Sequence, residues 1–268
     1  AKYVALVFPK FLLNTPEFST TRAELAQKSV DAILDFGEKG FPGILVETIA
    51  IFINNLAAPA NTKVFSLTHR LHLTQPQAYI FDPELPYWII YRNQLFDSVC
   101  RKLDFDVFEV FRDRQLTNKL LSSSGELRVL KSRNLSDDGK AILDIPGYDS
   151  YISYAAAKPL SVFQYLDAPN VYLTPNMTYK PRMMKKPPHC VVNGSLAILI
   201  PKGGIVPTEK QLAYFSSEEY RAFYQIARNF QTRSLNVDAC SVFFYGLLRD
   251  EAKPAPEKFD TSVQLSFL

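Results

Sequence analysis

Hydrophobic residues in the first quarter of the chain occur in short runs separated by polar segments. Residues 3–8 are apolar throughout, as expected of a strand covered on both faces. Residues 16–28 predict a helix, with Pro16 in its first turn and Thr15 as a candidate cap. Further strands are predicted at 30–36, 48–53 and 63–67. This order of strands and helix indicates half of a doubly wound α/β sheet.

The pattern changes after residue 68. Residues 69–76 are polar and contain proline, so a domain boundary is predicted there, between 1–68 and 69–268. The second part mixes short helices and strands, which favours an α+β domain. Its helices are expected at 93–103, 159–166 and 208–230, and its strands at 105–111, 127–131, 191–201 and 242–245.

Two capping-box spacings subdivide the helical segment near residue 210. Thr208 precedes Gln211 by three residues, and Ser216 precedes Glu219 by three. The second helix is expected to continue to about residue 230. One stripe of this helix is aromatic, and we interpret it as core.

Composition narrows the class of protein further. A chain of 268 residues can hold one large domain or two small ones, and its net charge of +3 does not by itself imply a polyanionic partner. The three cysteines are widely spaced, which favours a reducing compartment and a cytoplasmic protein. The apolar runs are too short to cross a bilayer, so no membrane association is expected. A strand so close to a first residue that is not Met suggests a fragment of a larger protein, although a trimmed end would look the same.

Several motifs that would carry chemistry do not occur. The chain has no Gly-x-x-x-x-Gly-Lys-Ser/Thr loop, and glycines 37, 40 and 43 have the wrong spacing for a dinucleotide loop. His69 and His72 lack a nearby third ligand, so no metal site is expected. His189 and Cys190 have no identifiable orienting partner for nucleophilic catalysis.

The charge distribution is more informative than the net charge. No Asp or Glu occurs between Asp167 and Glu209, and this stretch contains five cations. Similar clusters of Arg, Asn and Ser occur elsewhere in the second part, including Arg228–Ser234. Phosphates bind cations and hydroxyls, whereas base edges bind Arg, Asn and Gln. The candidate DNA-binding residues are Arg112, Arg114, Lys131, Arg133, Asn134, Asn176, Tyr179, Lys180, Arg182, Lys185, Lys186, Asn193, Ser195 and Arg233.

Several segments resemble adenine-specific DNA methyltransferases of restriction–modification systems. Residues 4–14, 21–22, 33–37 and 47–49 resemble the part of the catalytic domain that follows its active-site motif. Residues 172–182, 192–195 and 231–235 resemble the target-recognition part of the type IIS members, and 125–134 and 147–151 resemble type I specificity domains.

The resemblance implies that 1–68 is the end of a methyltransferase catalytic domain and that 69–268 is a DNA target-recognition domain. The family's Asn/Asp-Pro-Pro-Tyr/Phe motif is missing, because Pro187 and Pro188 lack the amide before them and the aromatic after them. The S-adenosylmethionine loop is missing as well. No catalytic residue is therefore expected in this chain, no cofactor is expected to bind it, and S-adenosylmethionine would bind the parent transferase. The expected partners are double-stranded DNA and an upstream catalytic half of the same protein.

Within this hypothesis the candidate residues divide into two groups. Lys180, Arg182, Lys185 and Lys186 are expected on the phosphate backbone. Base edges are expected to meet Asn176, Arg133, Asn134 and Arg233. Three alternatives remain open: a non-catalytic specificity subunit of a type I system, a basic domain that binds an acidic protein, and an RNA-binding domain that uses Tyr172 and Tyr179.

Overall fold

The computed structural model describes residues 1–41, 43, 45–231 and 236–250. These residues form two compact units. The first contains Ala1–Arg101 and the described part of Gln225–Leu235, and the second contains Lys102–Tyr224 and Asn236–Asp250. Residue 68, where the sequence predicts a boundary, lies inside the first unit. The roles assigned to 1–68 and 69–268 stay predictions.

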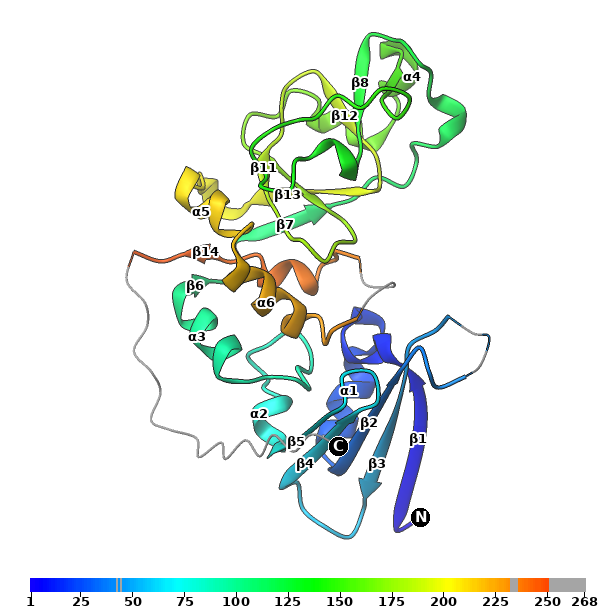
Figure 1. Cartoon of the computed structure of the whole chain (residues 1–268), viewed down its shortest axis with the longest axis vertical. Helices are drawn as coiled ribbons and strands as arrows, with labels where there is room; N and C mark the ends of the chain where they lie inside the picture. Colours follow the sequence, from blue (N-terminus) through cyan, green and yellow to red (C-terminus); the bar gives the residue numbers. More distant parts are fainter. Residues whose placement is uncertain (42, 44, 232–235, 251–268) are drawn as a thin grey trace. The chain divides into compact units, whose positions relative to one another are not determined.

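A five-stranded mixed sheet forms the centre of the first unit (Figure 1). Its strands are β1 (Tyr3–Pro9), β2 (Ser29–Gly37), β3 (Thr48–Asn54), β4 (Asn61–Ser66) and β5 (Leu71–Pro76). Their spatial order is β1-β3-β2-β4-β5, and the β2–β4 pair alone is parallel. The mixed α/β class and the four predicted strands are confirmed, whereas a methyltransferase-like doubly wound sheet is not.

Strand β5 occupies most of the polar segment 69–76, where the sequence predicts no strand. The polar side chains of this strand are accommodated because they form hydrogen bonds and ring contacts with neighbouring segments. Gln75 is buried and donates a hydrogen bond to the Arg92 carbonyl at 2.6 Å. His72 stacks on Phe65 of the neighbouring strand, with 4.4 Å between ring centroids.

The predicted helix at 16–28 is divided in two. A 3₁₀ turn, η2 (Pro16–Phe18), precedes α1 (Ser19–Ala26), and the Thr15 side chain makes no capping hydrogen bond. Another 3₁₀ turn, η1 (Lys10–Leu13), follows β1. The helices α2 (Gln77–Ile80) and α3 (Gln94–Lys102) complete the described helices of this part, and α3 confirms the helix predicted at 93–103.

A buried ion pair joins η1 to β2. Lys10 Nζ lies 2.7 Å from Asp35 Oδ2, and both side chains are at most 2% exposed. Tyr91 donates its hydroxyl to the same oxygen at 2.5 Å, and the Gly37 amide donates to Asp35 Oδ1 at 2.8 Å. Burial and the Asp35 carboxylate raise the pKa of Tyr91 well above its usual value. Asp35 therefore holds three segments together through one carboxylate.

Small sheets form the second unit (Figure 1). A four-stranded sheet has the order β11-β10-β13-β7, a three-stranded sheet the order β12-β8-β9, and β14 pairs with β6. The bounds are β6 (Leu103–Asp104), β7 (Phe108–Phe111), β8 (Leu127–Leu130), β9 (Ser150–Ile152), β10 (Tyr172–Pro175), β11 (Met184–Lys185), β12 (Cys190–Val192), β13 (Leu196–Pro201) and β14 (Leu247–Leu248). The short helices are η3 (Asn118–Leu120), η4 (Ser132–Asn134), α4 (Tyr154–Ala157), η5 (Ser161–Tyr165), η6 (Lys202–Gly204), α5 (Glu209–Tyr214), α6 (Glu218–Ala227) and η7 (Ser241–Phe244). The predicted α+β character is confirmed.

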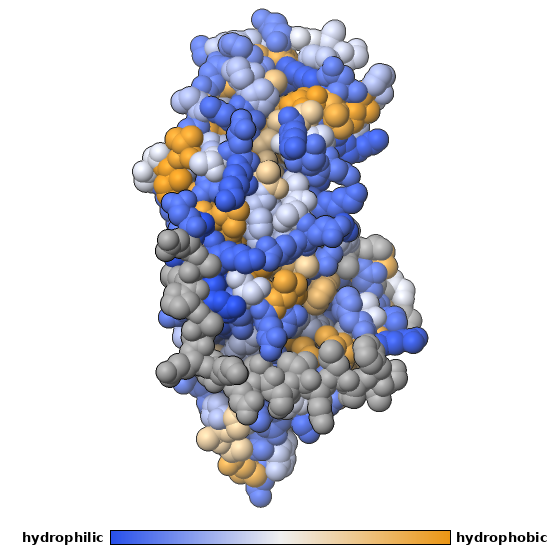
Figure 2. Space-filling model, turned by 60° about the vertical axis from the view of Figure 1, so that its left-hand side comes forward, coloured by the Kyte–Doolittle hydropathy of each residue, from blue (hydrophilic) through white to orange (hydrophobic). Residues whose placement is uncertain are grey.

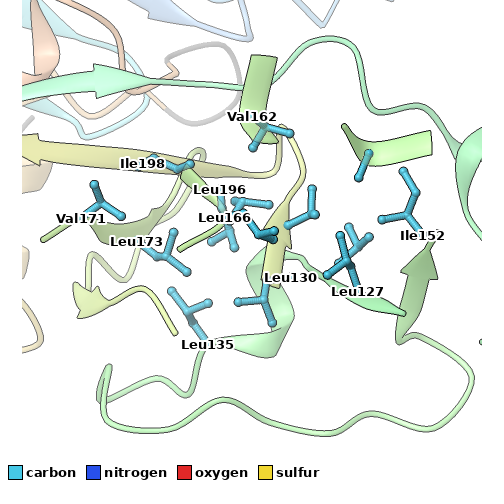
Figure 3. Close-up of a cluster of buried hydrophobic side chains, with 14 residues drawn as sticks. Leu127, Leu130, Leu135, Ile152, Val162, Leu166, Val171, Leu173, Leu196 and Ile198 are labelled. Carbon is cyan, nitrogen blue, oxygen red and sulfur yellow. The ribbon is translucent and has the colours of Figure 1, made fainter. Parts of the chain in front are cut away.

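One hydrophobic cluster joins the two larger sheets of the second unit (Figure 3). Leu127 and Leu130 of β8 pack in the same cluster as Leu173 of β10 and Ile198 of β13. All four side chains are at most 4% exposed. Because both sheets share this core, the loops at their ends are held in fixed relative positions.

Helix ends follow the capping prediction in one case. Thr208 and Gln211 form the predicted capping box of α5. At α6 the Tyr220 amide donates to Ser217 Oγ at 3.1 Å, so Ser217 occupies the position predicted for Ser216. The aromatic stripe is core as predicted, with Tyr220, Phe223 and Tyr224 at most 2% exposed. The helix ends at Ala227 because Asn229 and Phe230 have positive φ angles.

The strand predicted at 242–245 is wrong. The segment forms the 3₁₀ turn η7 instead. Ser241 starts this turn by accepting and donating local hydrogen bonds, and its Oγ accepts from the Asp238 amide at 2.8 Å. Apolar β-rich composition alone could not distinguish a buried strand from a buried turn.

Candidate nucleic-acid interface

The Asn176 side chain joins three segments that are distant in sequence. It directly follows β10 and is 5% exposed. Its Nδ2 donates to the Gly194 carbonyl at 3.2 Å and to Asn236 Oδ1 at 2.7 Å. Its Oδ1 accepts from the Val237 amide at 3.0 Å and from Arg112 Nη1 at 3.4 Å. Asn176 thus acts within the protein, and its amide positions the Arg112 guanidinium.

The turn between β12 and β13, which contains Gly194, connects this site to a fourth segment around Ser132. Ser195 Oγ accepts a hydrogen bond from the Ser132 amide at 2.9 Å and donates to Asn193 Oδ1 at 2.6 Å. Gly194 approaches the chain after β7 so closely that an added Cβ would lie 2.6 Å from the Asp113 carbonyl oxygen. Glycine is therefore required here for close backbone approach. Four segments rich in Arg, Asn and Ser therefore meet here, and they are 112–114, 131–134, the chain around 176, and 193–195.

Asn134 supports the η4 turn from inside. It is completely buried, and its Oδ1 accepts from the Lys131 amide at 2.9 Å. Its Nδ2 donates to the Leu143 carbonyl at 3.0 Å and to Asp149 Oδ1 at 2.6 Å. Both N–H donors are used and the side chain is completely buried, so Asn134 cannot also contact a base edge.

Two cations share one face of this turn with a tyrosine that the sequence analysis did not select. Lys131 Nζ lies 3.9 Å and Arg133 Cζ 4.7 Å from the Tyr148 ring centroid. Burial and then the neighbouring Arg133 lower the pKa of Lys131, while Asp149 opposes this shift. The only sequence signal for Tyr148 was its place in the segment 147–151. An aromatic ring that positions two like charges favours an anionic partner.

Arg112 and Arg114 form a second pair of like charges. Burial lowers the pKa of Arg112 most, followed by the charge of Arg114, while Asp238 raises it. Arg114 is exposed and, within the described ranges, makes no ion pair or side-chain hydrogen bond. The same holds for Arg133, apart from its contact with Tyr148. These two guanidiniums are therefore available for a ligand.

The stretch between Asp167 and Glu209 contains no carboxylate of its own, but carboxylates from other segments lie beside it. Lys180 pairs with Asp137 at 2.8 Å, and Lys202 pairs with Asp106 at 2.6 Å. The Lys180 ammonium lowers the pKa of Asp137 through its hydrogen bond and its charge. Long-range folding thus supplies the carboxylates that the local sequence lacks.

Two of the predicted phosphate contacts are buried. Arg182 is 7% exposed and donates to the carbonyls of Lys180, Ser132 and Leu135 at 3.0, 3.1 and 3.2 Å. Lys186 is 5% exposed and donates to the carbonyls of Leu166 and Pro187 at 2.7 and 3.0 Å. Burial lowers the pKa of both side chains. Both residues connect loops, and neither presents its charge at the surface.

The remaining candidates lie apart from the cluster or outside the description. Lys185 is exposed, but it pairs with Tyr172 at the end of β10 opposite Asn176. Tyr179 is 51% exposed in the loop after Asn176. Arg233 lies outside the described residues. The structure therefore brings together Arg112, Arg114, Lys131, Arg133, Asn176, Asn193 and Ser195, and we call this set with Tyr148 the polar cluster.

Replacing Lys186 with methionine tests its structural role. The carbonyls of Leu166 and Pro187 would lose their ammonium donor, so we expect a loss of roughly 1–3 kcal/mol of unfolding free energy. Binding to duplex DNA should not change at a temperature where the variant is folded. Urea unfolding and fluorescence anisotropy check the two parts. A matched control is Lys185→Met, on the adjacent exposed position, which should leave stability within about 0.5 kcal/mol.

Comparisons with known proteins give similarities to solved structures but no match by sequence. No protein-family model matches the chain, and no curated protein matches it with significance. The solved structure of the type IIG restriction endonuclease BpuSI is similar at a TM-score of 0.33 and 8% sequence identity. The similarity covers 91% of this chain and 39% of BpuSI, so the chain spans well under half of that enzyme. A TM-score of this size does not establish a common fold.

Other site types find no support in the described part of the chain. Among residues 1–41, 43, 45–231 and 236–250, no group of three or more His, Cys, Asp or Glu side chains could hold a metal ion. No described helix has the length and apolarity needed to span a membrane. The face of the second unit seen in Figure 2 is largely hydrophilic, interrupted by separate hydrophobic patches.

Proposed function

We propose that this chain is the DNA-recognition part of a site-specific adenine-N6 DNA methyltransferase of a restriction–modification system. The observation that carries the proposal is the convergence of four polar segments on the polar cluster. Exposed guanidiniums, hydroxyls and a tyrosine lie there on a rigid hydrogen-bonded base. This combination suits phosphate oxygens and base edges of a duplex.

The methyltransferase part of the proposal names the reaction that DNA recognition would serve, which is methyl transfer to adenine N6. It rests on the sequence resemblance of 3–53 and 172–235, and the catalytic motifs would belong to an upstream half. That half would bind S-adenosylmethionine and take up an extruded adenine. The polar cluster would position the duplex so that one adenine reaches that pocket. Arg133 and Arg114 would make the outermost contacts, with Lys131 and Arg112 behind them.

Salt-dependent binding tests the proposed role of the polar cluster. Anisotropy of a labelled duplex across a salt series should show log K falling steeply with log salt. The double variant Arg114→Ala/Arg133→Ala should flatten the slope by roughly 2, about one per lost phosphate contact. Within the described part of the chain both side chains lack partners apart from the Tyr148 ring, so folding should be preserved.

The matched control removes the same charge elsewhere. Lys158→Ala/Lys202→Ala takes away two cations outside the polar cluster, and Lys202 follows the far end of β13. We expect its slope to stay at the parent value. Equal slopes for the two double variants would show that binding depends on net charge alone. Absence of binding at low salt would reject the proposal for this chain.

A further inference from the structure

The two faces of the five-stranded sheet in the first unit differ sharply in burial. On β3, Ile49, Ile51 and Ile53 point to one face and are at most 7% exposed. Phe52 points to the opposite face and is 40% exposed, whereas Ala50 on that face is 4% exposed, so the open part of the face lies around Phe52. Strand alternation therefore separates a covered apolar face from one that the described residues leave open.

The open face is apolar across several strands. Register places Val7 opposite Ala50, Ala5 opposite Phe52 and Phe52 opposite Ala32, so these side chains share a face. Tyr3 and Val7 on β1 are 66% and 56% exposed. A hollow of about 630 Å³ lies in this face and is lined by Ala32, Leu34, Phe52, Phe65, Ser66, Leu67, Arg70 and Leu71.

An apolar hollow on a sheet face requires a cover in the working protein. A sheet with two apolar faces is stable when a layer of secondary structure packs on each. Contiguous exposed apolar surface of this kind marks an interaction site. Edge strand β1 supports the same conclusion. Its first six residues are apolar or aromatic and its seventh is proline, yet all seven are at least partly exposed. The lining residues lie on β2, β3 and β4 and in the segment 67–71, a span that one helix can cross.

Charge around the hollow restricts the chemistry of the partner. Arg70 lines the hollow and is exposed, and Lys63 lies on the same face opposite Ala32. Neither cation forms an ion pair with a described residue. Two carboxylates adjoin the lining in sequence: Asp35 is buried against Lys10, and Asp31, at the β2 bulge, accepts a hydrogen bond from Ser29 Oγ at 2.9 Å. A partner with carboxylates beside its apolar stripe would therefore be preferred over one with cations.

We propose that the open sheet face docks an amphipathic helix whose apolar stripe is flanked by acidic residues. Its apolar side chains fill the hollow over Leu34, Phe52 and Phe65, and its carboxylates pair with Arg70 and Lys63. The helix belongs to the upstream catalytic half of the same protein, and this part of the inference rests on the proposed function. In this proposal the sheet face attaches the DNA-recognition part to the catalytic half.

Two synthetic helical peptides test the proposal. Both have about 18 residues and the same leucine stripe, and they differ in carrying Glu or Lys beside it. We expect the Glu peptide to bind the whole chain and to shift the amide resonances of β2, β3 and β4. The Lys peptide should bind roughly tenfold more weakly or worse. Phe52→Lys should abolish binding, and Arg70→Glu should reverse the preference between peptides.

Three results would overturn the proposal. The first is that neither peptide perturbs β2–β4, and the second is that both peptides bind equally well. The third is that the chain doubles its mass in light scattering and that Phe52→Lys is a monomer, which would make a second copy the occupant. DNA affinity of Phe52→Lys, measured in parallel, should match the parent. In the parent chain, absence of peptide binding together with normal DNA binding would reject this inference alone, whereas peptide binding without DNA binding would reject only the proposed function.

Discussion

Lys10→Met should destabilise the first unit by roughly 3–5 kcal/mol, because it leaves the Asp35 carboxylate buried without its cation. Asp35 is 1% exposed, so water cannot replace the ammonium. Tyr91 and the Gly37 amide would still donate to the carboxylate, but neither carries a charge. Trp88 is the single tryptophan and is buried in the same unit, so its fluorescence during urea unfolding reports the change.

A second substitution distinguishes charge burial from loss of packing. Lys10→Met/Asp35→Asn removes both charges, and the new amide oxygen can still accept from the Gly37 amide while its NH2 group donates to the Tyr91 hydroxyl. We expect the double variant to regain at least half of the stability lost by Lys10→Met. A single variant within about 0.5 kcal/mol of the parent would show that the pair is not important for folding.

Asn176→Ala should cost roughly 2–4 kcal/mol and should weaken duplex DNA binding more than tenfold at a temperature where the variant is folded. The substitution removes four hydrogen bonds at once, including the one that positions Arg112. Hydrogen exchange should increase in β10, in the 193–195 turn and near Val237. Denaturant unfolding and anisotropy measure the two effects separately.

Asn170 provides the control for Asn176. It lies before the opposite end of β10, donates to the Ile205 carbonyl at 2.9 Å and accepts from the Tyr172 hydroxyl at 3.0 Å. Asn170→Ala should reduce stability but leave DNA affinity at the parent value. Equal losses of affinity in both variants would mean that general loosening of β10, and not the position of Arg112, controls binding.

Local patterns predicted most strands of the first unit, because continuous apolar runs such as 3–8 and 48–53 leave little choice of conformation. They missed β5, where polar residues are satisfied by long-range bonds such as Gln75 to Arg92. They also placed a strand at 242–245, where aromatic residues fill a buried turn. Helix ends were harder still, since the cap of α6 shifted by one residue to Ser217.

The polar cluster was partly predictable. Composition selected loops rich in Arg, Asn and Ser, and four of these loops come together around Asn176. It could not tell which side chains turn inward. Arg182 and Lys186 satisfy buried carbonyls, and Lys180 finds Asp137 from a segment 43 positions away. Those outcomes depend on contacts between distant segments, which no local spacing encodes.

Selection from a randomised duplex library tests the central claim most directly. The chain should be incubated with duplexes that carry a random central segment, and the bound fraction sequenced over several rounds. Sequence-specific recognition predicts enrichment of one short motif containing adenine, and loss of that enrichment in Arg114→Ala/Arg133→Ala. Binding without enrichment of any motif, or preference for single-stranded RNA over every duplex, would contradict the account.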